Sequence, residues 1–173
     1  MATGNTIFNY VDDGKVISSI SNHKEGMGII NGQLKFGTVG TQPFTDFISG
    51  YPVLIKDKKK VPITTAKEID YNARRTVLAY NNSTVYLIAI EKPGMNFSAM
   101  QNLLLQLKVD YAINLDGGGS TKILHNGKSI TTDWGDRAVD NILAVYLKAT
   151  TLYRVQVGAF SLKRNADKFL KGV

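Results

Sequence analysis

Three consecutive glycines, Gly117, Gly118 and Gly119, follow an aspartate, Asp116, at the end of an apolar segment. The apolar segment, residues 109–113, has the β-branched and aromatic residues typical of a strand. Glycine runs mark a turn or a close approach of the main chain to a ligand. In such a loop Asp116 could act as an acid, a base or an acceptor for a sugar hydroxyl, and the loop amides could donate to an anion.

The same residues also fit a loop that only turns the chain, with Asp116 exposed and Ser120 acting as a cap. The pattern is not that of a P-loop, because Ser120 is followed by Thr121 and only then by Lys122, whereas a P-loop has its lysine directly after the last glycine. The spacing alone leaves both interpretations of the loop open.

The composition limits which cofactors the chain could hold. A length of 173 residues with 43% hydrophobic content fits one domain with a real core, or a domain with a small appendage. The chain has no cysteine, which excludes disulfides and thiolate metal sites, and its two histidines, His23 and His125, are far apart. We therefore predict no cofactor and no metal site, although a hard cation held by carboxylates stays open.

The positive charge is concentrated in the last part of the chain. Residues 148–173 contain six Lys and Arg residues against one acidic residue, which places +5 of the net charge of +7 in this segment. A basic segment favours an anionic polymer such as a cell-wall glycan, a teichoic acid or a nucleic acid, or it is a solvated helix face. Elsewhere, the lysine-rich residues 56–60 are typical of a solvated hairpin turn rather than of a nucleic-acid patch, so of these polymers we expect a glycopolymer and not a nucleic acid.

The apolar runs of the sequence indicate whether a membrane span or a signal peptide is expected. No stretch approaches 18 apolar residues, so we expect no membrane span. Residues 1–10 lack the basic start and apolar middle of a signal peptide. Either the protein acts where it is made, or the start shown is not the natural one.

Hairpins and one helix make up most of the predicted structure. Turn residues at 31–32, 81–84 and 126–127 each separate two short strand-like runs. Residues 97–108 have apolar side chains on one helical face, with Asn96 or Ser98 as the cap. We predict an α+β fold, mainly an antiparallel sheet with hairpins and one principal helix packed on it, plus a C-terminal βα fragment.

Three motifs in this order resemble the phosphodiester glycosidase family. An Arg-Thr pair, Arg75-Thr76, opens a strand, a helix then leads to residues 114–120, and residues 136–141 precede a last strand. Residues 26–32 and 49–54 are similar to the family's segments before the arginine. The resemblance defines a domain at residues 1–149 that is short at its N-terminus.

The resemblance implies hydrolysis of a sugar-1-phosphodiester, of the N-acetylglucosamine 1-phosphate type, to free sugar and a phosphomonoester. It implies that Asp116 is the catalytic carboxylate and that Arg75 and Arg137 bind the phosphate. Glycoside hydrolysis commonly uses a second carboxylate, for which Asp136 is favoured over Asp70 and Asp140. The other residues assigned to substrate binding are Thr76, Asn114, Gly117, Gly118, Gly119, Ser120, Trp134 and Asn141.

Each of these roles has a structural alternative. Arg75 and Arg137 could form ion pairs with Asp136 or Asp140 that join loops. The ring of Trp134 could stack on a sugar or anchor its loop in the core. At the level of the whole protein, the alternative is a phosphosugar- or nucleotide-binding protein without catalysis, and a third hypothesis is an inert structural domain.

The C-terminal segment, residues 150–173, resembles the first strand and helix of a SPOR domain, a peptidoglycan-binding module of bacterial and phage wall proteins. This resemblance implies a bacterial or phage protein that acts at the cell wall or outside the cell, on a sugar phosphate or an envelope glycopolymer. The missing signal peptide instead allows a cytoplasmic location. The segment is a truncated module, so its strand is expected to pair with another chain or to dock on the preceding domain.

Overall fold

The computed structural model describes residues 8–18, 22–64, 71–132, 139, 141–147 and 153–159. The chain divides into two compact units, one formed by Gly50–Gly135 and the other by Met1–Ser49 together with Asp136–Val173. The predicted α+β class is confirmed, because antiparallel sheets dominate both units and the described residues contain a single α-helix.

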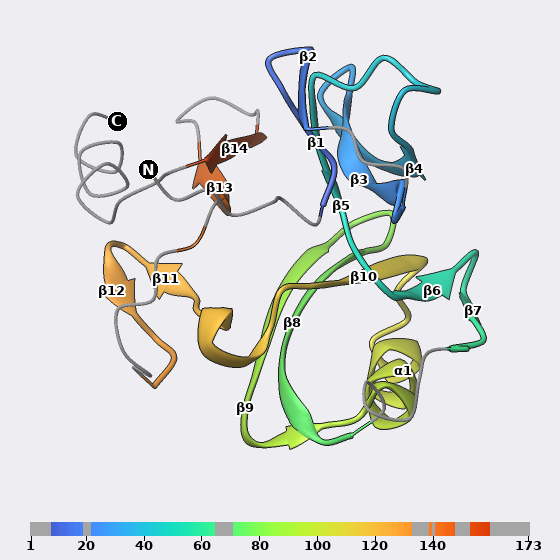
Figure 1. Cartoon of the computed structure of the whole chain (residues 1–173), viewed down its shortest axis with the longest axis vertical. Helices are drawn as coiled ribbons and strands as arrows, with labels where there is room; N and C mark the ends of the chain where they lie inside the picture. The colour runs from blue at the N-terminus through green and yellow to red at the C-terminus, as the bar shows by residue number, and fades with distance from the viewer. Residues whose placement is uncertain are drawn as a thin grey trace. The chain divides into compact units, whose positions relative to one another are not determined.

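The unit Gly50–Gly135 is built on a five-stranded antiparallel sheet (Figure 1). The strand order is β7-β6-β10-β8-β9, so β10 lies between two strands that precede it in the sequence. The bounds are β6 Val53–Lys56, β7 Lys59–Lys60, β8 Ala73–Tyr80, β9 Val85–Met95 and β10 Tyr111–Leu115. This order places the end of β10 beside the beginning of β8.

Helix α1, Phe97–Gln106, packs on one face of this sheet. Its cap is Asn96, whose side chain accepts a hydrogen bond of 2.8 Å from the Ala99 amide, and this confirms one of the two predicted caps. The helix buries Phe97, Met100 and Leu104 against sheet residues. The sheet residues of this core are Leu54, Ile55, Val77, Ala79 and Ala112. Burial of this apolar surface holds α1 on the sheet, and the chain then continues from α1 into β10.

The predicted hairpins are confirmed. In the unit Gly50–Gly135, β8 pairs with β9, and β11, Leu124–His125, pairs with β12, Lys128–Ser129. Asn126 and Gly127 join the second pair with φ angles of 50° and 74°. Two successive positive φ angles define the type I′ turn that an Asn-Gly pair favours.

The other unit has its own five-stranded antiparallel sheet, in the order β2-β1-β5-β3-β4. Its strands are β1 Tyr10–Asp12, β2 Lys15–Ser18, β3 Glu25–Ile30, β4 Gln33–Thr38 and β5 Asp46–Ser49. The hairpin predicted at residues 31–32 joins β3 to β4. A small core of Val11, Val39, Phe44 and Phe47 holds this sheet together.

A further hairpin belongs to this second unit. Strand β13, Asn141–Leu147, pairs in antiparallel register with β14, Tyr153–Ala159. Of the two partners predicted for the C-terminal strand, the structure therefore gives the preceding part of the same chain. The helix predicted after this strand lies outside the described residues. Within the described part of the chain, no helix is long and apolar enough to cross a membrane.

Candidate functional site

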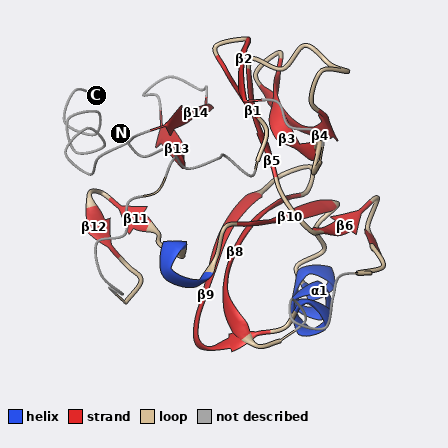
Figure 2. Ribbon diagram, viewed as in Figure 1, coloured by secondary structure: helices blue, strands red, loops and turns tan. Residues whose placement is uncertain are grey.

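The glycine loop begins where β10 ends. Leu115, the last residue of β10, pairs with Thr76 of β8, and Asp116 follows directly. Gly118–Ser120 form a single 3₁₀ turn, which Figure 2 shows as the short helix between β10 and β11. The strand pairing therefore holds Asp116 beside the start of β8, where the predicted Arg-Thr pair lies.

The loop main chain packs against the main chain of β8. A Cβ atom at Gly117 would lie 2.7 Å from the carbonyl oxygen of Arg74, closer than real Cβ contacts allow. Gly118 has a φ of +59°, in the left-handed region that glycine occupies without penalty. Two of the three glycines thus have separate reasons to be glycine, one steric and one conformational.

Asp116 is exposed, and its Oδ1 accepts a hydrogen bond of 2.9 Å from the Gly117 amide. The Ser120 amide donates to the Gly117 carbonyl at 3.0 Å. Two of the four amides that the sequence offers to an anion are therefore engaged inside the loop. A bound anion would have to use the amides of Gly118 and Gly119 or the neighbouring side chains.

Three hydroxyl groups belong to the loop, to the residue after it, or to the strand residue paired with Leu115. Thr76 Oγ1, Ser120 Oγ and Thr121 Oγ1 are buried, and none of them has a hydrogen-bond partner among the described residues. A buried polar atom without a partner costs about 1–3 kcal/mol, so such atoms are uncommon in folded proteins. Hydroxyl groups of this kind are the donors and acceptors that a sugar or a phosphate uses.

The two neighbouring arginines at the start of β8 have different partners. Arg74 is 8% exposed, and its Nη2 donates to the Thr121 carbonyl at 3.1 Å. Arg75 is equally buried, and its guanidinium carbon lies 3.9 Å from the centroid of the Phe97 ring. Arg75 also donates to the carbonyls of Met95 and Tyr71. Its predicted contact with phosphate stays a prediction.

A carboxylate that the sequence did not single out, Glu91, lies in β9 near Arg74. Glu91 accepts hydrogen bonds from both the hydroxyl and the amide of Thr132. The hydroxyl hydrogen bond, then the amide hydrogen bond, and finally the charge of Arg74 lower the pKa of Glu91, while desolvation acts in the opposite direction. These hydrogen bonds therefore favour the ionised form of Glu91.

Asn114 is buried in β10 and serves the adjoining segment. Its side-chain amide donates to the Tyr51 carbonyl at 2.9 Å and to the Leu115 carbonyl at 2.8 Å. Its Oδ1 is buried and has no hydrogen-bond partner in the described part of the chain. Asn114 thus fixes the main chain on which the glycine loop begins, and its predicted role in binding stays a prediction.

Several predicted site residues are not placed by the structure. Trp134, Asp136 and Arg137 lie outside the described residues, as do the alternative carboxylates Asp70 and Asp140. Asn141 is the first residue of β13, in the other unit, where its main chain pairs with Ala159. Among the residues that are described, no three His, Asp or Glu side chains form a cluster that could hold a metal ion.

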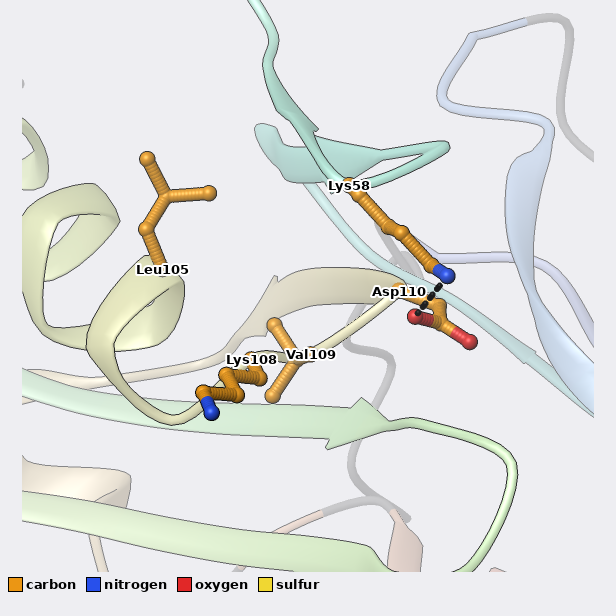
Figure 3. Close-up of a pocket in the computed structure, with 5 residues that line it drawn as sticks. All are labelled: Lys58, Leu105, Lys108, Val109 and Asp110. Carbon is orange, nitrogen blue, oxygen red and sulfur yellow. Dashed lines mark ion pairs between the residues drawn. The ribbon is translucent and has the colours of Figure 1, made fainter.

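A hollow of about 360 Å³ lies before the opposite end of β10, at Asp110 (Figure 3). Lys58, Leu105, Lys108, Val109 and Asp110 line it. The Lys58 ammonium pairs with the Asp110 carboxylate at 3.6 Å. Four residues of β10 separate Asp110 from Leu115, so this hollow is not part of the glycine-loop site.

The family model of the phosphodiester glycosidases matches residues 2–146. The chain belongs to this family. It is 27% identical over 170 residues to mouse N-acetylglucosamine-1-phosphodiester alpha-N-acetylglucosaminidase, an alignment that covers 82% of the chain and 33% of the mouse protein. The chain thus spans about a third of the length of this relative.

The fold is similar to that of a solved member of the family. The catalytic domain of zebrafish N-acetylglucosamine-1-phosphodiester alpha-N-acetylglucosaminidase, auto-inhibited by its pro-peptide, matches with a TM-score of 0.58 and 24% sequence identity. This match covers 73% of the chain and 50% of the zebrafish chain. It supports the fold described above.

Sequence reasoning missed three residues: Arg74 and Thr121, which are hydrogen bonded at the end of the glycine loop, and Glu91, which binds Thr132. Arg74 precedes the Arg-Thr pair, but the strand pattern does not predict where its side chain points, because the pairing of β8 with β9 shifts at this residue. Thr121 follows the glycine motif directly. No local pattern marks Glu91, because its partner Thr132 is 41 residues away in the sequence.

Proposed function

We propose that this chain hydrolyses a sugar-1-phosphodiester of the N-acetylglucosamine 1-phosphate type and releases free sugar and a phosphomonoester. Membership of the phosphodiester glycosidase family supports this proposal, as does the similarity to mouse N-acetylglucosamine-1-phosphodiester alpha-N-acetylglucosaminidase. The observation that carries it is the exposed Asp116 carboxylate on a glycine loop, which directly follows Leu115, the residue paired with Thr76. The hydroxyls of Thr76 and of the loop residue Ser120 are buried and have no hydrogen-bond partner among the described residues.

In this proposal Asp116 acts at the anomeric carbon, as the nucleophile or as the acid and base. The bond between C1 of the sugar and the phosphate oxygen breaks, the hydroxyl of water ends on C1, and the proton of water ends on the phosphomonoester. A phosphate leaving group needs little protonation, so one carboxylate can be sufficient. Asp136 stays the predicted second carboxylate.

Hydrogen-bond donors around the loop would bind the phosphate. Thr76 and Ser120 each have a buried hydroxyl without a hydrogen-bond partner among the described residues, and Arg75 and Arg137 keep the phosphate-binding role that their motif predicts. Trp134 keeps its predicted role of stacking on a sugar ring, and Asn141 keeps its predicted role in substrate or phosphate binding. Donors that are already in place favour the transition state, in which charge develops on the leaving phosphate.

We also propose an envelope glycopolymer of a bacterium as the natural substrate, with action at the cell wall. The resemblance of residues 150–173 to a SPOR domain supports this, as does the excess of positive charge in the same segment. A positive segment would attract a polymer that carries phosphodiesters. Binding of purified peptidoglycan and of teichoic acid to the full chain, measured by co-sedimentation, tests this part of the proposal.

The catalytic proposal is tested with Asp116→Asn, which removes the charge and keeps the shape. Sugar release from a model N-acetylglucosamine 1-phosphodiester should fall by about three orders of magnitude or more, while affinity for the intact diester changes little. The matched control is Asp13→Asn, since Asp13 is an exposed aspartate in a turn of the other unit.

Two outcomes would contradict the assignment. If wild-type protein binds the diester but releases no sugar, the chain is a phosphosugar-binding protein rather than a hydrolase. If Asp116→Asn turns over like wild type, then Asp116 is not the catalytic carboxylate.

A further inference from the structure

One residue outside the family motif, Arg74, contacts both ends of the glycine loop. Its carbonyl oxygen lies so close to Gly117 that only glycine fits there. Its side chain reaches the other end, where Nη2 donates to the Thr121 carbonyl at 3.1 Å. The main chain of Arg74 therefore contacts the loop at Gly117, and its side chain contacts the chain at Thr121. Ser120 lies between these two residues in the sequence, and Asp116 directly precedes Gly117.

The register of β8 explains how a strand residue can do this. The pairing of β8 with β9 shifts between Ala73 and Arg75, so Arg74 lies at the irregularity. Irregularities of this kind redirect a side chain and are common beside active sites. Arg75, the next residue, is directed to a different place, under the ring of Phe97 at the start of α1.

Glu91 lies across from Arg74 in the sheet, because Arg75 pairs with Ile90 of the neighbouring strand β9. The positive charge of Arg74 is one of the causes that lower the pKa of Glu91, after the two hydrogen bonds from Thr132. Glu91 in turn holds Thr132, which lies beyond the β11–β12 hairpin. A buried cation with a nearby anion and a carbonyl acceptor has a defined position, since moving it would leave charge without compensation.

We propose that Arg74 is a positioning residue, which holds the loop Gly117 to Thr121 so that Asp116 and Ser120 keep the geometry needed for the reaction. This rests on the proposed hydrolase function for its catalytic consequence, but not for its structural one. Arg74 acts through the loop and not through contact with the substrate. The neighbouring Arg75 does not share this role.

The first experiment measures the loop without any substrate. Hydrogen exchange followed by NMR reports on the amides of Ser120 and Thr121, which are hydrogen bonded inside the loop. Arg74→Met should speed their exchange about tenfold or more relative to the amide of Leu107, the C-cap residue of α1, because a charge-assisted hydrogen bond is lost. Arg75→Met should leave these two amides unchanged and speed exchange at Ala99 near the helix start.

The proposal is overturned if the amides of Ser120 and Thr121 are equally protected from exchange in wild type and in Arg74→Met. It is also overturned if Arg74→Met and Arg75→Met lose protection at these amides to the same extent. If Arg74→Met does not fold, Arg74→Lys provides the measurement. It keeps the cation but replaces the planar fork with one ammonium. We expect it to recover part of the protection.

The second experiment separates positioning from substrate binding. On the model diester, Arg74→Met should lower kcat about tenfold or more while KM stays within about threefold, and Arg74→Lys should recover part of kcat. Lys128→Met is the control, since Lys128 is an exposed cation of the β11–β12 hairpin. A rise in KM with unchanged kcat would make Arg74 a binding residue and overturn the proposal. If wild type has no activity, the proposed function fails, and the exchange experiment still decides the role of Arg74.

Discussion

Substitution of Gly117 by alanine tests whether the loop must lie directly on β8. The added Cβ would sit 2.7 Å from the Arg74 carbonyl oxygen, where an ordinary contact is at least 3.4 Å. The loop therefore has to move by about 0.7 Å, the difference between these two distances. Backbone strain adds nothing, because Gly117 has a φ of −128°, which alanine adopts freely.

A shift of this size should affect catalysis more than folding. Misplacing a catalytic group by about 1 Å can cost about a hundredfold in rate, so we expect Gly117→Ala to lower kcat about 10- to 100-fold. Overpacking typically costs about 1–3 kcal/mol, and the free energy of unfolding should fall within that range. Sugar release from the model diester and urea unfolding measure the two effects.

Gly127→Ala is the matched control for this substitution. Gly127 has a φ of +74° in the β11–β12 turn, and a Cβ there would meet no atom within 4 Å. We expect a loss of about 1–2 kcal/mol from the left-handed conformation and no change in kcat. The steric reasoning is refuted if Gly117→Ala keeps at least half of the wild-type kcat and is no less stable than Gly127→Ala.

Two further predictions concern the pKa of Glu91 and the core under α1. The folded-state pKa of Glu91 lies below its ordinary value of 4.5, so its interaction with Thr132 stabilises the fold above pH 4.5 and is lost as the pH falls through the lowered pKa. Thr132→Val should therefore raise the pKa of Glu91, measured by NMR titration of its carboxyl carbon, and make urea unfolding less sensitive to acid; an unchanged titration would contradict the assigned cause. Leu104→Ala should lower the free energy of unfolding by about 2–5 kcal/mol, because Leu104 is fully buried. Leu105→Ala, at a residue that is 37% exposed, should cost much less in the same urea titration, and equal losses would mean that the helix does not pack as described.

Local patterns were sufficient to predict the hairpins, the helix and the loop. The Asn-Gly turns require positive φ angles that few other residue pairs accept, and Asn126 and Gly127 have them. The helix from Phe97 and its Asn96 cap follow from spacings of three and four residues. Such features depend on residues that are close in sequence, so they can be predicted without knowledge of the fold.

Strand order was not accessible in this way. The position of β10 between β6 and β8 depends on pairings between residues far apart in the sequence, such as Leu115 with Thr76. Alternating apolar residues indicate which face of a strand is buried, but they do not name the neighbouring strand. The division into two five-stranded sheets likewise appears only in the structure.

The sequence by itself determined that an aspartate and three glycines end a strand, and that an Arg-Thr pair opens another, because residue types and short spacings carry that information. Only the tertiary structure decided that Arg74 reaches the loop while Arg75 lies under Phe97, and that Glu91 binds Thr132. The physical reason is that the direction of a side chain depends on strand register and on partners distant in sequence, which are settled only when the sheet forms.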